Sequence, residues 1–313
     1  MKIKILSAGP LSTIQDEGRK GYLSSGISSN GVMDYNSMAI ANVLVGNKLD
    51  EGVIETTYLG ITAEFDCDAV IALTGAECLA TINQTPVETY TAISVKSGDV
   101  LKMKSAISGM RSYVAVAGGF DISKQMGSVS TDVRSGIGGI NGNRLSVGDE
   151  IPLTRSVRLI DGAVRKLPKL NDYKNEIEVR VILGPQADKF TKKGINDFLS
   201  NEYLVSEKSD RMGIRLEGKG IESINGVDII SDGIAFGSIQ ISSSGMPIIM
   251  MADRQTTGGY AKIATVITVD LPLIAQLSKG AKIKFKKVSL SKAVSLLKKR
   301  DKQFKNYIKT LNG

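Results

Sequence analysis

Hydrophobic residues along the chain fall mostly in short runs bounded by glycine, asparagine, aspartate or proline. Runs rich in valine and isoleucine are typical of β-strands. Polar segments at 82–88 and 95–101 are expected to be turns between such strands. Many short strands with few helices predict a mainly β fold of barrels or sandwiches. The clearest strand candidates are AVIALTG (69–75), SYVAVAGG (112–119), EVRVILG (178–184), GIAFGSIQIS (233–242) and PIIMMAD (247–253).

Helical periodicity is sparse, and four segments carry it: 33–46, 186–201, 270–280 and the tail after residue 288. In the first, Met38, Ala41 and Val45 share one face, and Gly46 is expected to end the helix. In the third, Asp270 is expected to serve as N-cap with Pro272 in the first turn. The helices therefore supplement a β framework.

The chain has 313 residues, a length that suggests two domains or one large one. Its composition changes once, in a charged segment at 154–176 that contains Pro168. No fixed-period repeat is visible, which argues against a solenoid or propeller. We therefore predict a first β-barrel domain over 1–155, a linker over 156–176, a second β-barrel domain over 177–288 and a basic C-terminal helix over 289–313.

The formal net charge of +8 is concentrated in the tail. From Lys279 to Gly313 there are 12 Lys and Arg residues and one acid, a net charge of +11, so the rest of the chain has a net charge of −3. This predicts a terminal helix with a solvated basic face; an acidic partner or a membrane surface is the alternative. Nucleic acid is not favoured as a partner, because the body lacks a basic stripe. The apolar positions of the helix are Leu290, Val294, Leu297, Phe304, Ile308 and Leu311.

Several functional classes are excluded by what the sequence lacks. It has no histidine, which removes Ser-His-Asp and Cys-His catalysis, histidine-ligated zinc and HExxH enzymes, and no metal site is predicted. The glycine-rich segment SGIGGING (135–142) does not match GxGxxG, and no P-loop or GxSxG motif occurs. Cys67 and Cys78 are expected to be buried and unpaired. No apolar leader or membrane-length run is present, which predicts a cytoplasmic protein.

Four polar blocks place aspartate close to arginine among hydroxyls and glycines: 9–22, 127–139, 208–218 and 252–260. A single block of this kind also suits a buried Asp–Arg bridge that ties a loop to a barrel. Several blocks together favour at least one real pocket. Because arginine binds carboxylate and phosphate in a bidentate manner, the expected ligand is a small polar or anionic substrate.

The fourth block, ADRQTTGGY (252–260), is the leading site candidate. In an extended chain Asp253 and Gln255 would share one face while Arg254 points to the other, and the two glycines would permit positive φ and close backbone approach to a ligand. We predict Asp253, Gln255 and Thr257 as catalytic residues, with the carboxylate acting as a base or orienting water. Asp132 and Arg134 are expected to share a strand face, and Asp16 and Arg19 to flank a turn. The predicted substrate-binding residues are Arg254, Thr256, Gly258, Gly259, Tyr260, Arg211, Asp132, Arg134, Gln15, Asp16 and Arg19.

Six stretches of the chain carry a family resemblance when taken in order: GPLSTIQDEGRKGYLSSGISSNGVMDYNSMAIANVLVGN, ALTGAE, YVAVAGGFD, GSVSTDVRSGIGG, DRMGIRLEG and MMADRQTTGGYAKIATVITVDLPLIAQL. Together they resemble the allophanate hydrolase subunit 2 family. It is also called the biotin-dependent carboxyltransferase family or the family of the 5-oxoprolinase C component, and it includes the antagonist of the Kip kinase inhibitor. The similarity runs from about residue 5 to residue 287. Glu17 and Asn30 depart from the family pattern.

The resemblance implies two cyclophilin-like β-barrels and two partners, a B-type cyclophilin-like protein and a lactam-utilisation subunit. The complex would open 5-oxoproline to glutamate at the expense of ATP, which this chain or a partner would bind. Two other functions stay open: a binding protein that antagonises a histidine-kinase inhibitor, and a carboxyltransferase of a biotin-dependent urea carboxylase. The polar blocks favour the enzyme. Because the tail follows the last family block, truncation after Val288 is expected to leave the fold intact.

Overall fold

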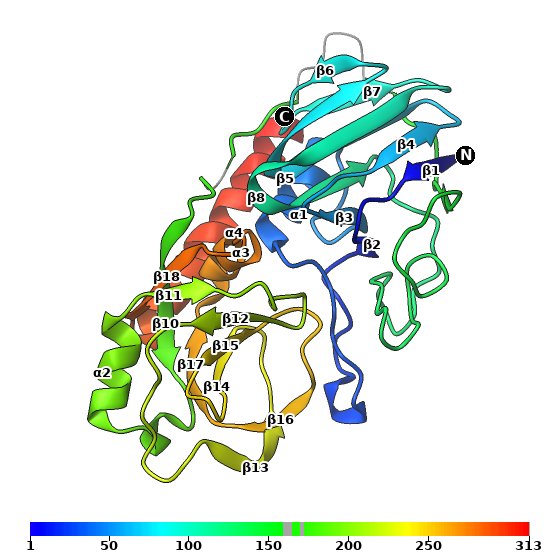
Figure 1. The fold of residues 1–313 in the computed structure, drawn as a ribbon. Helices are drawn as coiled ribbons and strands as arrows, with labels where there is room; N and C mark the ends of the chain where they lie inside the picture. Colours follow the sequence, from blue (N-terminus) through cyan, green and yellow to red (C-terminus); the bar gives the residue numbers. More distant parts are fainter. Residues whose placement is uncertain (159–164, 170–171, 313) are drawn as a thin grey trace. The chain divides into compact units, whose positions relative to one another are not determined.

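The computed structural model describes residues 1–158, 165–169 and 172–312, and these residues form two compact units (Figure 1). The first unit consists of Met1–Lys20, Asn30–Tyr173 and Lys302–Gly313, and the second of Gly21–Ser29 and Lys174–Asp301. Each unit is therefore assembled from separate parts of the chain. The predicted mainly β fold is confirmed, whereas the proposed domain boundaries stay a prediction.

The first unit is built on one curled antiparallel sheet of nine strands. The strand order is β2-β3-β8-β4-β1-β9, and β5 pairs with β6, β7 and β8. The predicted turn at 82–88 is confirmed: Ile82 pairs with Thr85, and Asn83 and Gln84 both have positive φ, as tight hairpins require. The strands are β1 (Lys2–Ser7), β2 (Ser12–Gln15), β3 (Val53–Thr57), β4 (Thr62–Phe65), β5 (Ala69–Ile82), β6 (Thr85–Val87), β7 (Ala92–Val95), β8 (Val100–Val116) and β9 (Glu150–Pro152).

This sheet separates two hydrophobic cores. Side chains alternate along the AVIALTG run of β5, so that Ile71 and Leu73 enter one core while Val70 and Ala72 enter the other. The second core is covered by α1 (Tyr35–Leu44), which begins after Asp34, whose side chain accepts a hydrogen bond from the Ser37 backbone N–H. The helix predicted over 33–46 is therefore confirmed.

The C-terminal helix α4 (Leu290–Asn312) supplies part of that second core. Phe304 is 2% exposed, and its ring meets the ring of Tyr35 edge-on with centroids 6.0 Å apart. By contrast, Leu290 and Val294 at the start of the helix are exposed. The predicted helix is confirmed. The truncation after Val288 that was expected to leave the fold intact would remove part of this core, because the distal apolar positions of the helix pack against it.

The second unit contains a closed barrel in the order β10-β17-β14-β15-β12-β11-β18. Strands β13 and β16 pair separately. The helix predicted over 186–201 begins later, at α2 (Lys192–Ser200), after a short 3-10 turn over Ala187–Lys189. The remaining elements are β10 (Glu176–Leu183), β11 (Tyr203–Val205), β12 (Gly213–Glu217), β13 (Asp228–Gly233), β14 (Ser238–Ile241), β15 (Pro247–Met250), β16 (Thr257–Tyr260), β17 (Lys262–Val266), α3 (Leu271–Ala275), β18 (Lys282–Lys287) and the 3-10 turns Leu23–Ser25 and Thr268–Asp270.

Asp270 occupies the N-cap position of α3 as predicted, but its side chain does not cap the helix. Its carboxylate instead binds Arg180 of β10, accepting hydrogen bonds from the Arg180 backbone N–H at 2.8 Å and from Nε at 2.9 Å. The side chain of Asp270 is 2% exposed. A buried carboxylate needs a cationic partner, and this one ties α3 to the barrel wall.

The expectation that both cysteines are buried and unpaired is correct only in part. Both cysteines are free thiols, but only Cys78 is buried, while Cys67 is partly exposed. None of the helices among the described residues is long and apolar enough to span a membrane.

Candidate functional site

The leading block begins directly after β15, at the end of a barrel strand. The chain turns there instead of remaining extended: the backbone N–H of Arg254 donates to the carbonyl of Met251 at 3.3 Å. The expected alternation of Asp253 and Gln255 against Arg254 is therefore wrong, because that pattern requires a strand.

Asp253 forms a bidentate ion pair with Arg211, a residue 42 positions earlier in the sequence. Arg211 Nε donates to Asp253 Oδ2 at 2.8 Å and Nη2 donates to Oδ1 at 3.0 Å. The backbone N–H of Asp253 also donates to the Arg211 carbonyl at 2.9 Å. Arg211 is buried, whereas the Asp253 side chain remains 24% exposed. The pair therefore presents a rigidly held, partly exposed carboxylate that can accept a hydrogen bond from a ligand or a water molecule.

Arg254 braces the turn that holds Asp253. Its Nε donates to the Ile234 carbonyl at 2.9 Å and its Nη1 to the Met251 carbonyl at 3.2 Å. The guanidinium lies 5.5 Å from the centre of the Phe236 ring, and burial lowers its pKa to about 10. The Arg254 carbonyl accepts a hydrogen bond from Ser28 Oγ at 2.8 Å. These contacts stabilise the turn, and contact between Arg254 and substrate stays a prediction.

The block ends in β16, which begins at Thr257, while Gln255 and Thr256 lie before the strand. The side chains of Gln255 and Thr257 are exposed, whereas Thr256 and Tyr260 are partly buried. Gly258 and Gly259 lie in the strand and do not adopt the positive φ that we expected. A Cβ at Gly258 would approach Ile234 Cδ1 to 2.7 Å and Gln240 Nε2 to 2.9 Å. This glycine therefore permits close packing within the protein.

Asp132 and Arg134 lie in a turn of the first unit, so the expectation that they share a strand face is wrong. Oδ1 of the buried Asp132 accepts hydrogen bonds from the backbone N–H groups of Arg134 and Ser135, both at 3.1 Å. Aspartate commonly closes turns in this way. The Arg134 side chain is exposed. A role for either residue in binding substrate stays a prediction.

Asp16 is the centre of a buried hydrogen-bond network at the end of β2. Its Oδ1 accepts from Ser128 Oγ at 2.5 Å, from Ser130 Oγ at 2.6 Å and from the Gly18 backbone N–H at 2.7 Å. Its Oδ2 accepts from the Val129 backbone N–H at 2.9 Å. Both serines are fully buried. In this block the carboxylate therefore fastens a distant loop through serines, in place of the expected Asp–Arg bridge.

Gln15 and Arg19 fasten the same region from either side of Asp16. Gln15 Nε2 donates to the Thr131 carbonyl at 3.1 Å, and its Oε1 accepts from the Gly31 backbone N–H at 3.2 Å. Arg19, 2% exposed, donates from Nη2 to the Ser130 carbonyl at 2.6 Å. The three predicted residues are thus brought together, and all three hold the loop at 127–132.

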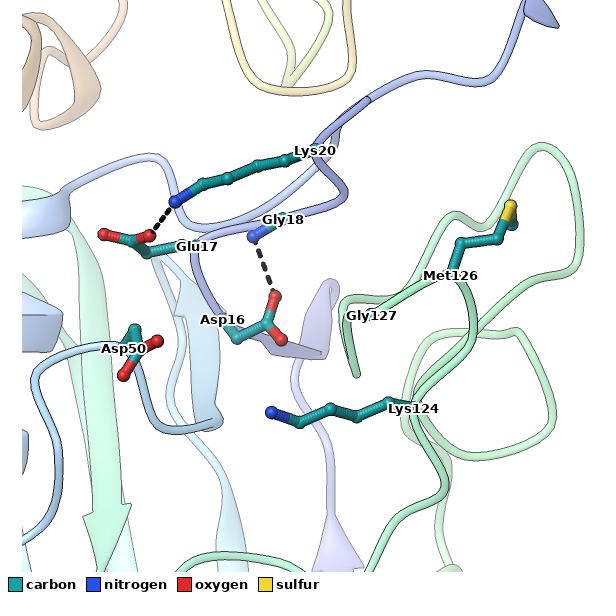
Figure 2. A pocket seen from close by; sticks show the side chains of 8 residues that line it. All are labelled: Asp16, Glu17, Gly18, Lys20, Asp50, Lys124, Met126 and Gly127. Carbon is teal, nitrogen blue, oxygen red and sulfur yellow. Dashed lines mark hydrogen bonds and ion pairs between the residues drawn. The ribbon is translucent and has the colours of Figure 1, made fainter. Parts of the chain in front are cut away.

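A small polar cavity of about 210 Å³ opens beside this network (Figure 2). Lys20 forms an ion pair with Glu17 on one side, and the amine of Lys124 points into the space between Asp16 and Asp50. Both signs of charge therefore face a space suited to a small polar molecule. Sequence reasoning missed Asp50, Lys124 and Met126, because they lie outside the four Asp–Arg blocks. The lining residues are Asp16, Glu17, Gly18, Lys20, Asp50, Lys124, Met126 and Gly127.

Asp16→Asn should lower the free energy of unfolding by about 1–2 kcal/mol, because hydrogen bonds to a charged acceptor are stronger than those to an amide oxygen. Glu17→Gln, which alters a neighbouring and more exposed carboxylate, should change it by less than about 0.5 kcal/mol. Urea unfolding of both variants measures this difference. Equal effects of the two substitutions would show that the Asp16 network does not stabilise the unit.

A second buried polar group was not predicted at all. Tyr113 Oη donates to Glu55 Oε2 at 2.9 Å and accepts from the Asp34 backbone N–H at 2.9 Å, while the same Glu55 oxygen accepts from the Met33 N–H at 2.8 Å. Burial raises the pKa of Tyr113 well above its usual value. The available signal was an acid within the strand-like run GVIETTY. This group ties the start of α1 to the sheet.

Comparison with known proteins decides the family. The carboxyltransferase domain family, subdomains A and B, matches residues 25–287. The chain belongs to this family. This carboxyltransferase-family chain is 38% identical over 302 residues to the C subunit of 5-oxoprolinase from Escherichia coli K12. The alignment covers 96% of each of the two proteins. It is 38% identical over 300 residues to the C subunit of 5-oxoprolinase from Haemophilus influenzae, covering 96% of this chain and 95% of that protein.

The fold is shared with a larger enzyme. The structure of K. lactis urea amidolyase matches 98% of this carboxyltransferase-family chain with a TM-score of 0.91 and 28% identity. The matched region is 20% of the urea amidolyase chain. The family predicted from the polar blocks is therefore confirmed, and its members occur both as separate subunits and within larger chains.

Proposed function

We propose that this chain is the C subunit of a 5-oxoprolinase, which opens 5-oxoproline to glutamate with ATP. Its partners in the proposal are a B-type cyclophilin-like protein and a lactam-utilisation subunit. The observation that carries the proposal is 38% identity over nearly the full length of two proteins named as the C subunit of 5-oxoprolinase. The match to urea amidolyase supports the alternative less strongly, because it covers only a fifth of that larger chain.

The geometry around Asp253 suits part of this reaction. Ring opening adds water across the lactam C–N bond, so the site must hold a planar amide and a water molecule in a fixed relation. In the proposal, the Asp253 carboxylate orients the water or the lactam N–H, while Gln255 and Thr257 offer amide and hydroxyl contacts beside it. Because Arg211 holds both carboxylate oxygens, Asp253 is already in position before substrate binds.

ATP does not fit the helix N-termini of the described part of this chain. Phosphates bind at helix N-termini whose backbone N–H groups are free to contact them. The α1 terminus is capped by Asp34, a negatively charged residue, and the Gly194 N–H of α2 is bound by Thr191. At α4, Ser289 Oγ accepts from the Lys292 N–H. The proposal therefore places ATP on one of the partner proteins. Biotin would enter only under the urea carboxylase alternative.

The purified chain alone is expected to show no 5-oxoprolinase activity, and activity should appear when both partner subunits are added. The reason is that this chain has a candidate substrate carboxylate but no P-loop sequence, and its longer helices are capped at their described N-termini. The measurement is glutamate formation from 5-oxoproline with ATP, for the chain alone, each pair and the full mixture. ATP-dependent turnover by the chain alone would contradict the division of roles, and an inactive full mixture would contradict the proposed function.

A carboxyltransferase role with urea is the second candidate, favoured by the TM-score of 0.91 with urea amidolyase. It predicts transfer of carboxylate from carboxybiotin to urea when biotin carboxylase and biotin carrier proteins are supplied. The same preparation can be assayed for both reactions. Urea carboxylation without 5-oxoproline turnover would favour this second candidate over the first.

A further inference from the structure

A single row of four lysines runs along one face of helix α4. Lys298, Lys302, Lys305 and Lys309 follow one another at intervals of four, three and four residues. At 3.6 residues per turn, these positions fall within about 60° around the helix axis and extend along roughly 16 Å of it. All four side chains are exposed. We call this set the lysine row.

No acid within the described residues neutralises the lysine row. Asp301, the acid of α4, pairs with Arg300, and none of the four lysines forms an ion pair with another residue that the structure describes. Like charges three or four residues apart on a helix repel one another, so the row weakens the helix that carries it. Three of the four lysines of strand β18 differ: Lys282 and Lys284 pair with Glu202, and Lys286 pairs with Glu178.

The opposite face of the same helix is already occupied. Phe304 is buried in the core of the first unit, and Tyr307, Ile308 and Leu311 pack against that core. An amphipathic helix that binds a membrane surface must insert its apolar face among the lipids. In this half of α4 that face is not available. A polyphosphate partner is also disfavoured, because the rest of the chain has a net charge of −3.

We propose that the lysine row is a docking surface for an acidic stripe on another protein of the same complex. The inference rests on the proposed function, which requires partner proteins. Carboxylates spaced by one helical turn, or along one strand, would match the axial spacing of the row. Helix α4, which carries the row, begins at Leu290, just after the family match ends at residue 287.

The test compares two variants of equal charge change in the full-length chain. The row variant carries Lys298→Gln, Lys302→Gln, Lys305→Gln and Lys309→Gln, since glutamine is as good a helix former as lysine. The control variant carries Lys279→Gln, Lys282→Gln, Lys284→Gln and Lys286→Gln, four lysines with acidic partners within the chain. Affinity for the B-type cyclophilin-like and lactam-utilisation proteins is measured at low and high salt, and circular dichroism checks that both variants fold.

The row variant should bind the partner proteins roughly 10- to 100-fold more weakly at low salt, with a smaller salt dependence, and the control should lose less than about threefold. Equal affinity of the row variant and the unsubstituted chain would overturn the proposal, as would equal losses in both variants. Phosphatidylglycerol vesicles and duplex DNA serve as further probes. Binding to either one that disappears in the row variant, with assembly unchanged, would also overturn it.

The two proposals fail in different ways. If the unsubstituted chain assembles with its partners but forms no glutamate from 5-oxoproline, the proposed function fails while the docking surface stands. If the mixture is active and the row variant is equally active and equally tightly bound, the docking surface fails alone. Absence of any assembly by the unsubstituted chain would contradict both.

Discussion

Asp253→Asn should lower the turnover of the reconstituted complex by about 100-fold or more, the effect expected when a positioned acid or base is lost. The substitution keeps the size of the side chain but removes the charge that Arg211 holds at 2.8 and 3.0 Å. Because the Asp253 side chain is 24% exposed, the stability loss should stay below the roughly 3–5 kcal/mol typical of a broken buried pair. Glutamate formation and melting temperature are measured on the same preparation.

The barrel contains a matched control for this substitution. Asp270 also forms a charge pair with an arginine of the second unit, Arg180, but its side chain is 2% exposed. Asp270→Asn should therefore cost more stability than Asp253→Asn, while the folded variant keeps its activity. If both variants melt at lower temperature and both keep full activity when folded, Asp253 is a structural brace and the site assignment is wrong.

Thr257→Ala completes the comparison. The Thr257 side chain is exposed in β16, so its loss should change the free energy of unfolding by less than about 0.5 kcal/mol. A large fall in turnover with unchanged stability would then show that the Thr257 hydroxyl takes part in the reaction.

Phe304→Ala should destabilise the first unit by about 3–5 kcal/mol, the usual cost of removing a buried phenylalanine. Phe304 is 2% exposed and packs against the core that includes Met38 and Leu44 of α1. Truncation after Val288 removes Phe304 together with the rest of α4, so it should have at least the same effect. Urea unfolding, followed by circular dichroism, measures both.

The start of the same helix supplies the control. Leu290 and Val294 are 66% and 41% exposed, so replacing either with alanine should change stability by less than about 0.5 kcal/mol. A truncated protein that unfolds at the same urea concentration as the full chain would show that α4 is not part of the core.

Much of the framework could be predicted from the sequence because its signals are local. The alternation in AVIALTG follows from the two-residue period of a strand, and it survives in β5 as alternate contacts with two cores. The helix over 35–44 and the hairpin after Ile82 likewise follow from short-range patterns. The ordered polar blocks identified the family for a related reason: each is a contiguous stretch, which can be recognised before the chain is folded.

What the sequence could not determine is which polar side chain meets which. Each block places an aspartate beside an arginine, yet Asp253 pairs with Arg211 from another block, and Asp16 binds serines 112 and 114 residues away. The burial of the C-terminal helix could not be predicted for the same reason. Both Phe304 and Val294 are apolar positions of that helix, yet only Phe304 is buried. Strand and helix patterns depend on neighbours in the chain. Pairing and burial depend on how distant segments come together, so only the tertiary structure decided them.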